Sequence, residues 1–116
     1  ISPLGLGENN QTYNINGDTA AGAIAKSLKS RRLLLMTNVE GVLNKEKKLI
    51  EEISSTEILK MIKDETITEG MIPKINTCLD AINNGVTAVG IIDGRKQHSI
   101  LFEIFSDKGS GTLIRK

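Results

Sequence analysis

The chain has 116 residues and a mass of 12.6 kDa, which is enough for one domain with one core. Its 15 Lys and Arg residues and 14 Asp and Glu residues leave a net charge of +1, and aromatic residues make up only 3%. This composition excludes the basic patch and stacking rings of a nucleic-acid-binding protein, and no apolar stretch is long enough to cross a membrane. The single cysteine, Cys78, cannot form an internal disulfide, so a cytoplasmic setting is expected.

The first third of the chain predicts one helix and one strand. A turn-rich stretch over residues 5–11 is followed by an alanine-rich helix over 18–28. Asn16 or Asp18 can act as the N-cap of this helix, because both side chains accept hydrogen bonds from free backbone N–H groups. The apolar run 33–36 then favours a strand that is buried on both faces, as in a parallel sheet covered by helices.

The rest of the chain continues this alternation. A short edge strand over 49–53 leads into a helix that Ser54 or Ser55 caps and that ends near residue 63, with an apolar face of Ile58, Leu59 and Ile62. The later elements are a long helix with Pro73 in its first turn that ends at 84–85, a buried strand over 86–92, a helix over 99–105 and a strand over 112–114. The expected fold class is α/β, with a mostly parallel sheet sandwiched by helices.

Polar residues gather where an α/β fold binds ligands, at the carboxyl ends of strands and the N-termini of helices. Lys74 lies in the first turn of a predicted helix, where a cation opposes the helix dipole unless an anion also binds there. The alternative is a solvated surface lysine, and Asp18 alone is more commonly an N-cap than a catalytic group. No Walker-type motif, no G-x-G-x-x-G after a strand and no cluster of metal ligands occurs in the sequence. The residues alone therefore predict an α/β domain with an anion site and no metal site.

Five short motifs stand out when the chain is considered as a whole. They are Y-N-I-N-G-D, L-L-M-T-N-V-E-G-V-L, T-E-G-M-I-P-K, I-I-D-G-R and F-S-D-K-G-S-G-T-L-I. In this order and at this spacing they resemble the acetylglutamate kinases of the amino-acid kinase family. The turn T-x-V-x-G-V-L is shared with other amino-acid kinases, whereas Y-N-I-N and G-M-I-P-K are more particular to the acetylglutamate enzymes.

The resemblance implies that residues 1–116 are the C-terminal, ATP-binding domain of such a kinase. The N-terminal substrate lobe of the family, with its glycine-rich phosphate loop and second lysine, has no counterpart in this chain. Because the chain opens on Ile1, we expect it to be a piece of a longer polypeptide that is inactive alone. The full-length enzyme is expected to be a homo-oligomer.

The implied reaction is the ATP-dependent phosphorylation of the side-chain carboxylate of N-acetyl-L-glutamate, a step of arginine biosynthesis. A carboxylate nucleophile with a pKa of about 4.3 is already ionised at neutral pH, so it needs no general base. Phosphoryl transfer instead needs positioning and positive charge around the transferred group. The nucleotide is expected to arrive with Mg²⁺ bound to its phosphates.

The resemblance also assigns roles to individual residues. Lys74 is expected to stabilise the transferring phosphoryl group and the departing ADP, and Asp18 to hold the catalytic lysines. Asn14 is expected to contact acetylglutamate, with Asn16 nearby. The expected walls of the nucleotide site are Thr37, Asn38, Val39, Gly41, Leu43, Thr66, Ile67, Thr68 and Met71. Position 38 carries Asn where many relatives carry Asp, so the turn has one negative charge fewer.

A last group of residues resembles the signature of the arginine-inhibited members of the family. This group is His98, Glu103, Gly109 and Gly111, and it predicts an allosteric site for L-arginine. Glu103 and nearby carbonyl groups can accept hydrogen bonds from a guanidinium. The alternative is that His98 only begins a helix and the two glycines only shape a turn.

Two further functions stay open at this point. One is a stand-alone nucleotide- or arginine-binding module without catalysis. The other is an amino-acid kinase that phosphorylates a different carboxylate.

Overall fold

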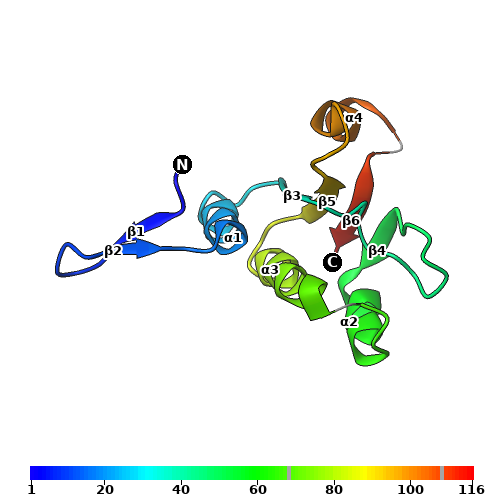
Figure 1. Cartoon of the computed structure of the whole chain (residues 1–116), viewed down its shortest axis with the longest axis horizontal. Helices are drawn as coiled ribbons and strands as arrows, with labels where there is room; N and C mark the ends of the chain where they lie inside the picture. Colours follow the sequence, from blue (N-terminus) through cyan, green and yellow to red (C-terminus); the bar gives the residue numbers. More distant parts are fainter. Residues whose placement is uncertain (68, 108) are drawn as a thin grey trace.

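The computed structural model describes residues 1–67, 69–107 and 109–116, so the prediction for Thr68 lies outside the described residues. A central sheet carries helices on both faces, and a separate β-hairpin extends from one side (Figure 1). The elements in chain order are β1 (Leu4–Leu6), β2 (Thr12–Asn14), α1 (Gly17–Ser27), β3 (Arg32–Thr37), β4 (Glu52–Ser54), α2 (Ser55–Lys63), the 3-10 turn η1 (Glu69–Met71), α3 (Ile72–Asn83), β5 (Ala88–Asp93), α4 (Ser99–Phe105) and β6 (Gly111–Arg115).

The described strands of the central sheet follow the order β3-β5-β6-β4. β3 pairs with β5 in parallel, and β4 pairs with β6 in parallel, which confirms the prediction of a mostly parallel α/β sheet. β5 and β6 instead run antiparallel, with Ile92 opposite Gly111. The helix between them is short, since the seven residues of α4 span about 10 Å against roughly 20 Å for β5, and the chain enters β6 beside the end of β5.

The core lies between the sheet and the helices α1, α2 and α3. Val89, Ile91 and Ile114 are fully buried on this face, together with Ile58 of α2 and Ile75 of α3. α4 lies on the opposite face of the sheet (Figure 1), where its side chains approach the backbone of β5. The helices therefore cover both faces, as the sequence predicts.

Two predictions of burial are only partly correct. β5 is buried at every position, but β3 is an edge strand, and its Met36, which lines a cavity beside the start of α4, is 48% exposed. On α2, Ile58 is buried as predicted, whereas Leu59 is 47% exposed. α2 packs against the short edge strand β4, so only a narrow stripe of the helix is covered.

Polar side chains set the helix starts as predicted. Ser54 and Glu57 form a reciprocal capping box at the start of α2, and the hydrogen bonds from Ser54 lower the pKa of Glu57. At α1 the N-cap is Asn16, whose Oδ1 accepts hydrogen bonds from the backbone N–H groups of Asp18 and Thr19. The carboxylate of Asp18 is thereby left available for another partner.

The chain also has features that the sequence does not predict. β1 and β2 form an antiparallel hairpin that points away from the sheet (Figure 1). On α4, five apolar side chains are exposed, those of Ile100, Leu101, Phe102, Ile104 and Phe105. Across the described ranges, no helix is long and apolar enough to span a membrane.

Candidate functional site

Lys74 and Asp18 form an ion pair at the point where two helices begin. Lys74 Nζ donates a hydrogen bond of 2.6 Å to Asp18 Oδ2, and the side chains are 15% and 31% exposed. Asp18 lies in the first turn of α1 and Lys74 in the first turn of α3, 56 positions apart in sequence. The structure therefore brings together the two residues predicted to be catalytic, and Lys74 is not a solvated surface lysine.

The packing of α1 against α3 fixes the geometry of this pair. One turn further along, an added Cβ at Gly22 would lie only 2.9 Å from Cγ2 of Thr77, so glycine permits a close helix approach. A further turn along, Lys26 forms an ion pair with Asp80. The two helices thus run side by side in the same direction, with an ion pair at each end of the contact and a glycine between them.

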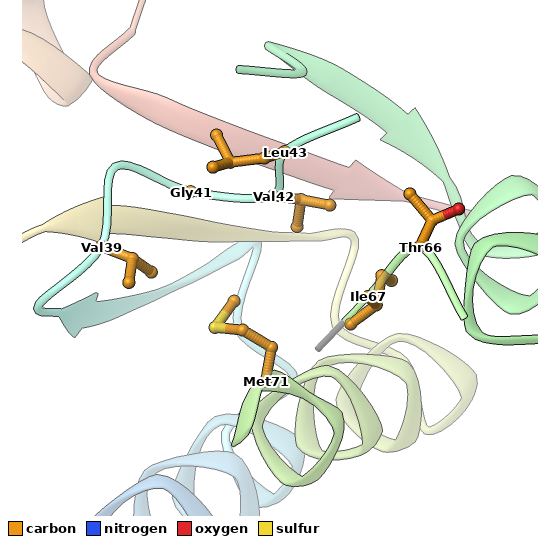
Figure 2. Close-up of a pocket in the computed structure, with 7 residues that line it drawn as sticks. All are labelled: Val39, Gly41, Val42, Leu43, Thr66, Ile67 and Met71. Carbon is orange, nitrogen blue, oxygen red and sulfur yellow. The ribbon is translucent and has the colours of Figure 1, made fainter. Parts of the chain in front are cut away.

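An apolar cavity lies beside the N-terminus of α3. Its volume is about 210 Å³, and its lining residues are Val39, Gly41, Val42, Leu43, Thr66, Ile67 and Met71. Figure 2 shows that the side chains of Val39, Val42, Ile67 and Met71 border the same space from the loop after β3 and from the segment before α3. Flat apolar groups such as a nucleobase suit a cavity of this size and lining.

The apolar cavity and the ion pair are neighbours on one helix. Met71 lines the cavity and is also the N-cap of α3, while Lys74 lies three residues further along. Three residues of helix correspond to about 4.5 Å along the axis. The positive end of the α3 dipole lies at this point, beside the ammonium group of Lys74, and both favour an anion. A ligand with an apolar ring and a phosphate chain can therefore occupy both places.

Most residues of the predicted nucleotide site line this cavity. The exceptions among the described residues are Thr37 and Asn38, which precede it at the end of β3 and in the following turn. Val42, which belongs to the same turn of the T-N-V-E-G-V-L motif, also lines the cavity.

The two predicted substrate residues lie on the other side of the ion pair. Asn14 ends β2 of the exposed hairpin, and Asn16 caps α1 next to Asp18. Asn16 therefore has a structural task as well as a place near the predicted catalytic residues.

A second cavity of about 270 Å³ lies on the α4 face of the sheet and is lined mainly by charged residues. Its lining residues are Arg32, Glu51, Glu52, Glu103, Ser106, Asp107, Gly109, Gly111, Leu113 and Arg115. Glu103 is 8% exposed, and its carboxylate accepts hydrogen bonds from Arg32 Nη1 at 3.4 Å and from the backbone N–H of Ser110 at 2.9 Å. We call this space the acidic cavity.

Three of the four residues predicted to bind arginine line the acidic cavity, namely Glu103, Gly109 and Gly111. His98 does not. It precedes α4 in a left-handed conformation and borders the exposed apolar side chains of that helix, including Phe105. The reason is helical geometry, since His98 and Glu103 are five positions apart and their side chains therefore point in different directions around the axis of α4.

The I-I-D-G-R motif forms an ion pair within its own turn. Arg95 donates hydrogen bonds to both carboxylate oxygens of Asp93, at 2.9 and 2.8 Å. These bonds lower the pKa of Asp93 to about 2 and raise the pKa of Arg95. Gly94 N–H also donates to the carbonyl of Thr37 at 2.7 Å, so this turn supports the end of β3.

Neither a reactive cysteine nor a group of metal ligands occurs among the described residues. Cys78 is buried in α3, and burial raises the pKa of its thiol to about 12, so the thiol stays protonated at neutral pH. In the part of the chain that the structure describes, no three His, Cys, Asp or Glu residues are grouped so that they could hold a metal ion.

Two acetylglutamate kinases match this chain in sequence over its whole length. The acetylglutamate kinase of Pelagibacter ubique is 63% identical over 116 residues, which is 100% of this chain and 40% of that protein. The acetylglutamate kinase of Methylobacterium nodulans is 55% identical over 116 residues, which is 38% of that protein. The chain thus spans about two fifths of the length of the curated relatives that it matches.

Solved structures show the same architecture. N-acetylglutamate synthase from Neisseria gonorrhoeae, complexed with coenzyme A and L-arginine, has a TM-score of 0.92 at 29% identity. The match covers 100% of this chain and 27% of the synthase chain. Carbamate kinase from Giardia lamblia bound to AMP-PNP has a TM-score of 0.70 at 26% identity, and the match covers 94% of this chain and 40% of the kinase. The model of the amino acid kinase family matches residues 1–93. The chain belongs to the amino acid kinase family.

Proposed function

We propose that this chain is the nucleotide-binding part of an acetylglutamate kinase, which transfers a phosphoryl group from ATP to the side-chain carboxylate of N-acetyl-L-glutamate. The observation that carries the proposal is the apolar cavity at the same helix N-terminus as the Lys74–Asp18 pair. The names of the relatives, and AMP-PNP bound to the carbamate kinase of similar fold, support it.

In this proposal each part of the site has a separate task. The apolar cavity holds the adenine ring, and the positive end of the α3 dipole attracts the phosphates. Lys74 stabilises the negative charge that builds up on the transferred group and on ADP, while Asp18 fixes the direction of its ammonium group. Mg²⁺ arrives bound to the nucleotide phosphates. The substrate carboxylate attacks as the anion, with Asn14 and Asn16 beside it.

A chimera tests the proposal at the level of activity. The chain replaces the matching segment of the Pelagibacter ubique enzyme, and formation of the acyl phosphate is measured by trapping with hydroxylamine. We expect activity with N-acetyl-L-glutamate and, in a substrate panel, less with aspartate or carbamate. Lys74→Met should lower kcat by about a hundredfold or more, since it removes a group that stabilises transition-state charge.

The matched control is Lys60→Met, because Lys60 is an exposed lysine on α2, away from the cavity. It should leave kcat unchanged. A chimera that phosphorylates acetylglutamate equally well with Lys74→Met would contradict the assigned role. Saturable binding of MgADP to the 116-residue chain, without turnover, is the result expected for the chain alone.

We further propose that the acidic cavity binds L-arginine as a feedback inhibitor. The specific observation in its favour is Glu103, a nearly buried carboxylate whose contact with Arg32 is 3.4 Å long. A ligand guanidinium can make shorter, bidentate hydrogen bonds to such a group. L-arginine in the complex of the Neisseria gonorrhoeae synthase, which has a similar fold, supports the proposal.

Titration calorimetry with L-arginine tests this second function. L-citrulline is the control ligand, because it has nearly the same shape but no charge. We expect binding of arginine alone, and a loss of that binding in Glu103→Gln. Equal heats for the wild type and for Glu103→Gln would exclude this assignment.

A further inference from the structure

A buried hydroxyl connects the central sheet to the wall of the apolar cavity. Thr112, the second residue of β6, is 1% exposed. Its Oγ1 accepts a hydrogen bond from the backbone N–H of Val42 at 2.8 Å and donates one to the carbonyl of Ile50 at 2.6 Å. Both capacities of the hydroxyl are therefore used, and both partners belong to the segment that joins β3 to β4.

These two bonds hold both ends of one loop. Within the loop, Ile50 N–H donates to the carbonyl of Val42 at 2.9 Å, so residues 42 and 50 lie opposite each other. Thr112 binds the remaining backbone group of each of these two residues. The loop is thereby attached to β6 at its base, at Val42, which itself lines the cavity.

The contact is also close in space. Gly41 has φ +148°, and a Cβ there would lie 2.6 Å from Thr112 Oγ1 and 3.1 Å from Thr112 N. Only glycine combines this backbone conformation with this approach. Gly41 and Val42 form part of the wall of the apolar cavity, so the position of Thr112 determines the position of this part of the wall.

We propose that Thr112 is a positioning residue of the nucleotide site, whose hydroxyl holds the cavity wall at residues 41–43 in its binding position. This inference rests on the proposed function, in which the cavity binds the adenine ring. Thr112 acts through the loop and makes no contact with the nucleotide. Valine at this position has the same shape but leaves two backbone groups without partners, whereas serine keeps the hydroxyl.

The test compares Thr112→Val, Thr112→Ser and the wild-type chain in calorimetric titrations with MgADP. We expect Thr112→Val to weaken binding about tenfold, because two hydrogen bonds that fix the wall are lost, and Thr112→Ser to restore affinity close to that of the wild type. Hydrogen exchange of the Val42 amide should accelerate in Thr112→Val and stay slow in Thr112→Ser. Thr56→Val, at an exposed threonine of α2, is the matched control and should change neither measurement.

The outcomes separate this inference from the proposed function. A wild-type chain that does not bind MgADP overturns the proposed function, and the inference with it. Binding in the wild type with equal affinity in Thr112→Val overturns the inference alone. Equal weakening in the serine and valine variants also overturns it, because the hydroxyl that serine keeps would then not be the group that holds the wall. Circular dichroism checks the fold, and Thr112→Ala is the second variant if the valine variant does not fold.

Discussion

Two ion pairs on opposite faces of the sheet differ in the distance between their charged groups and in how far the cation is buried. On the α1–α3 face, Lys74 and Asp18 are 2.6 Å apart and both are mostly buried. On the α4 face, Glu103 is 8% exposed, but Arg32 is 43% exposed and 3.4 Å away. The first pair is a fixed arrangement of charge. The second leaves a buried carboxylate with a loosely held cation, which is the condition under which a ligand can take the place of the cation.

The largest expected effect comes from removing the carboxylate of each pair in turn. Asp18→Asn should lower the free energy of unfolding by about 2 kcal/mol, because it leaves the mostly buried ammonium of Lys74 unpaired. Glu103→Gln should cost only about 1 kcal/mol, because the exposed Arg32 remains hydrated and the amide oxygen still accepts from Ser110. Urea unfolding of both variants measures the difference. An equal loss in both would mean that the two pairs are not distinct.

A smaller effect is expected from the helix contact that sets the first pair. Alanine has a higher helix propensity than glycine by about 1 kcal/mol, but at Gly22 its Cβ meets Cγ2 of Thr77. Gly22→Ala alone should therefore give little or no gain in stability. In a Thr77→Ser background, where Cγ2 is absent, the same substitution should stabilise the chain by about 1 kcal/mol. Thermal unfolding of the four proteins measures both changes, and identical effects in the two backgrounds would rule out the contact.

The smallest effect concerns the buried Asp93 and its exposed partner Arg95, and it depends on pH. The pKa of Asp93 is about 2 in the fold, below its ordinary value of 3.8. A lowered carboxyl pKa stabilises the fold above the ordinary value and loses that stabilisation as the pH falls towards 2. The difference in the free energy of unfolding between the wild type and Asp93→Asn should thus be largest at neutral pH, and it should shrink as the pH falls from 3.8 to about 2. A stability difference that grows as the pH falls would contradict the predicted direction of the pH dependence.

Much of the fold could be predicted from local sequence. Ser54 with Glu57 indicates where α2 begins, and Pro73 with Asn84-Gly85 gives the limits of α3, because caps and breakers act within a few residues. The antiparallel pairing of β5 with β6 could not be predicted in this way. A helix between two strands favours parallel pairing, and no local motif in this segment indicates that the chain turns back beside the end of β5.

In the candidate site, too, the residues of contiguous motifs could be predicted, whereas contacts between residues distant in sequence could not. Val39, Ile67 and Met71 could be predicted because they belong to motifs that are contiguous in sequence. The bond from Thr112 to Val42 could not, since the residues are 70 positions apart and the hydroxyl has no local signature. The placement of His98 was not predictable either, because the signature does not say which side of α4 each residue occupies.

The alternation of side chains along β6 has a consequence for redesigning this protein. Leu113 and Arg115 line the acidic cavity, whereas Thr112, between Gly111 and Leu113, is bonded to the loop beside the apolar cavity. A shift of the strand by a single residue would exchange the two sets of side chains between the two faces. The register of β6 therefore determines the lining of the acidic cavity and the attachment of the loop beside the apolar cavity. A change of this register made to alter one cavity would also alter the other.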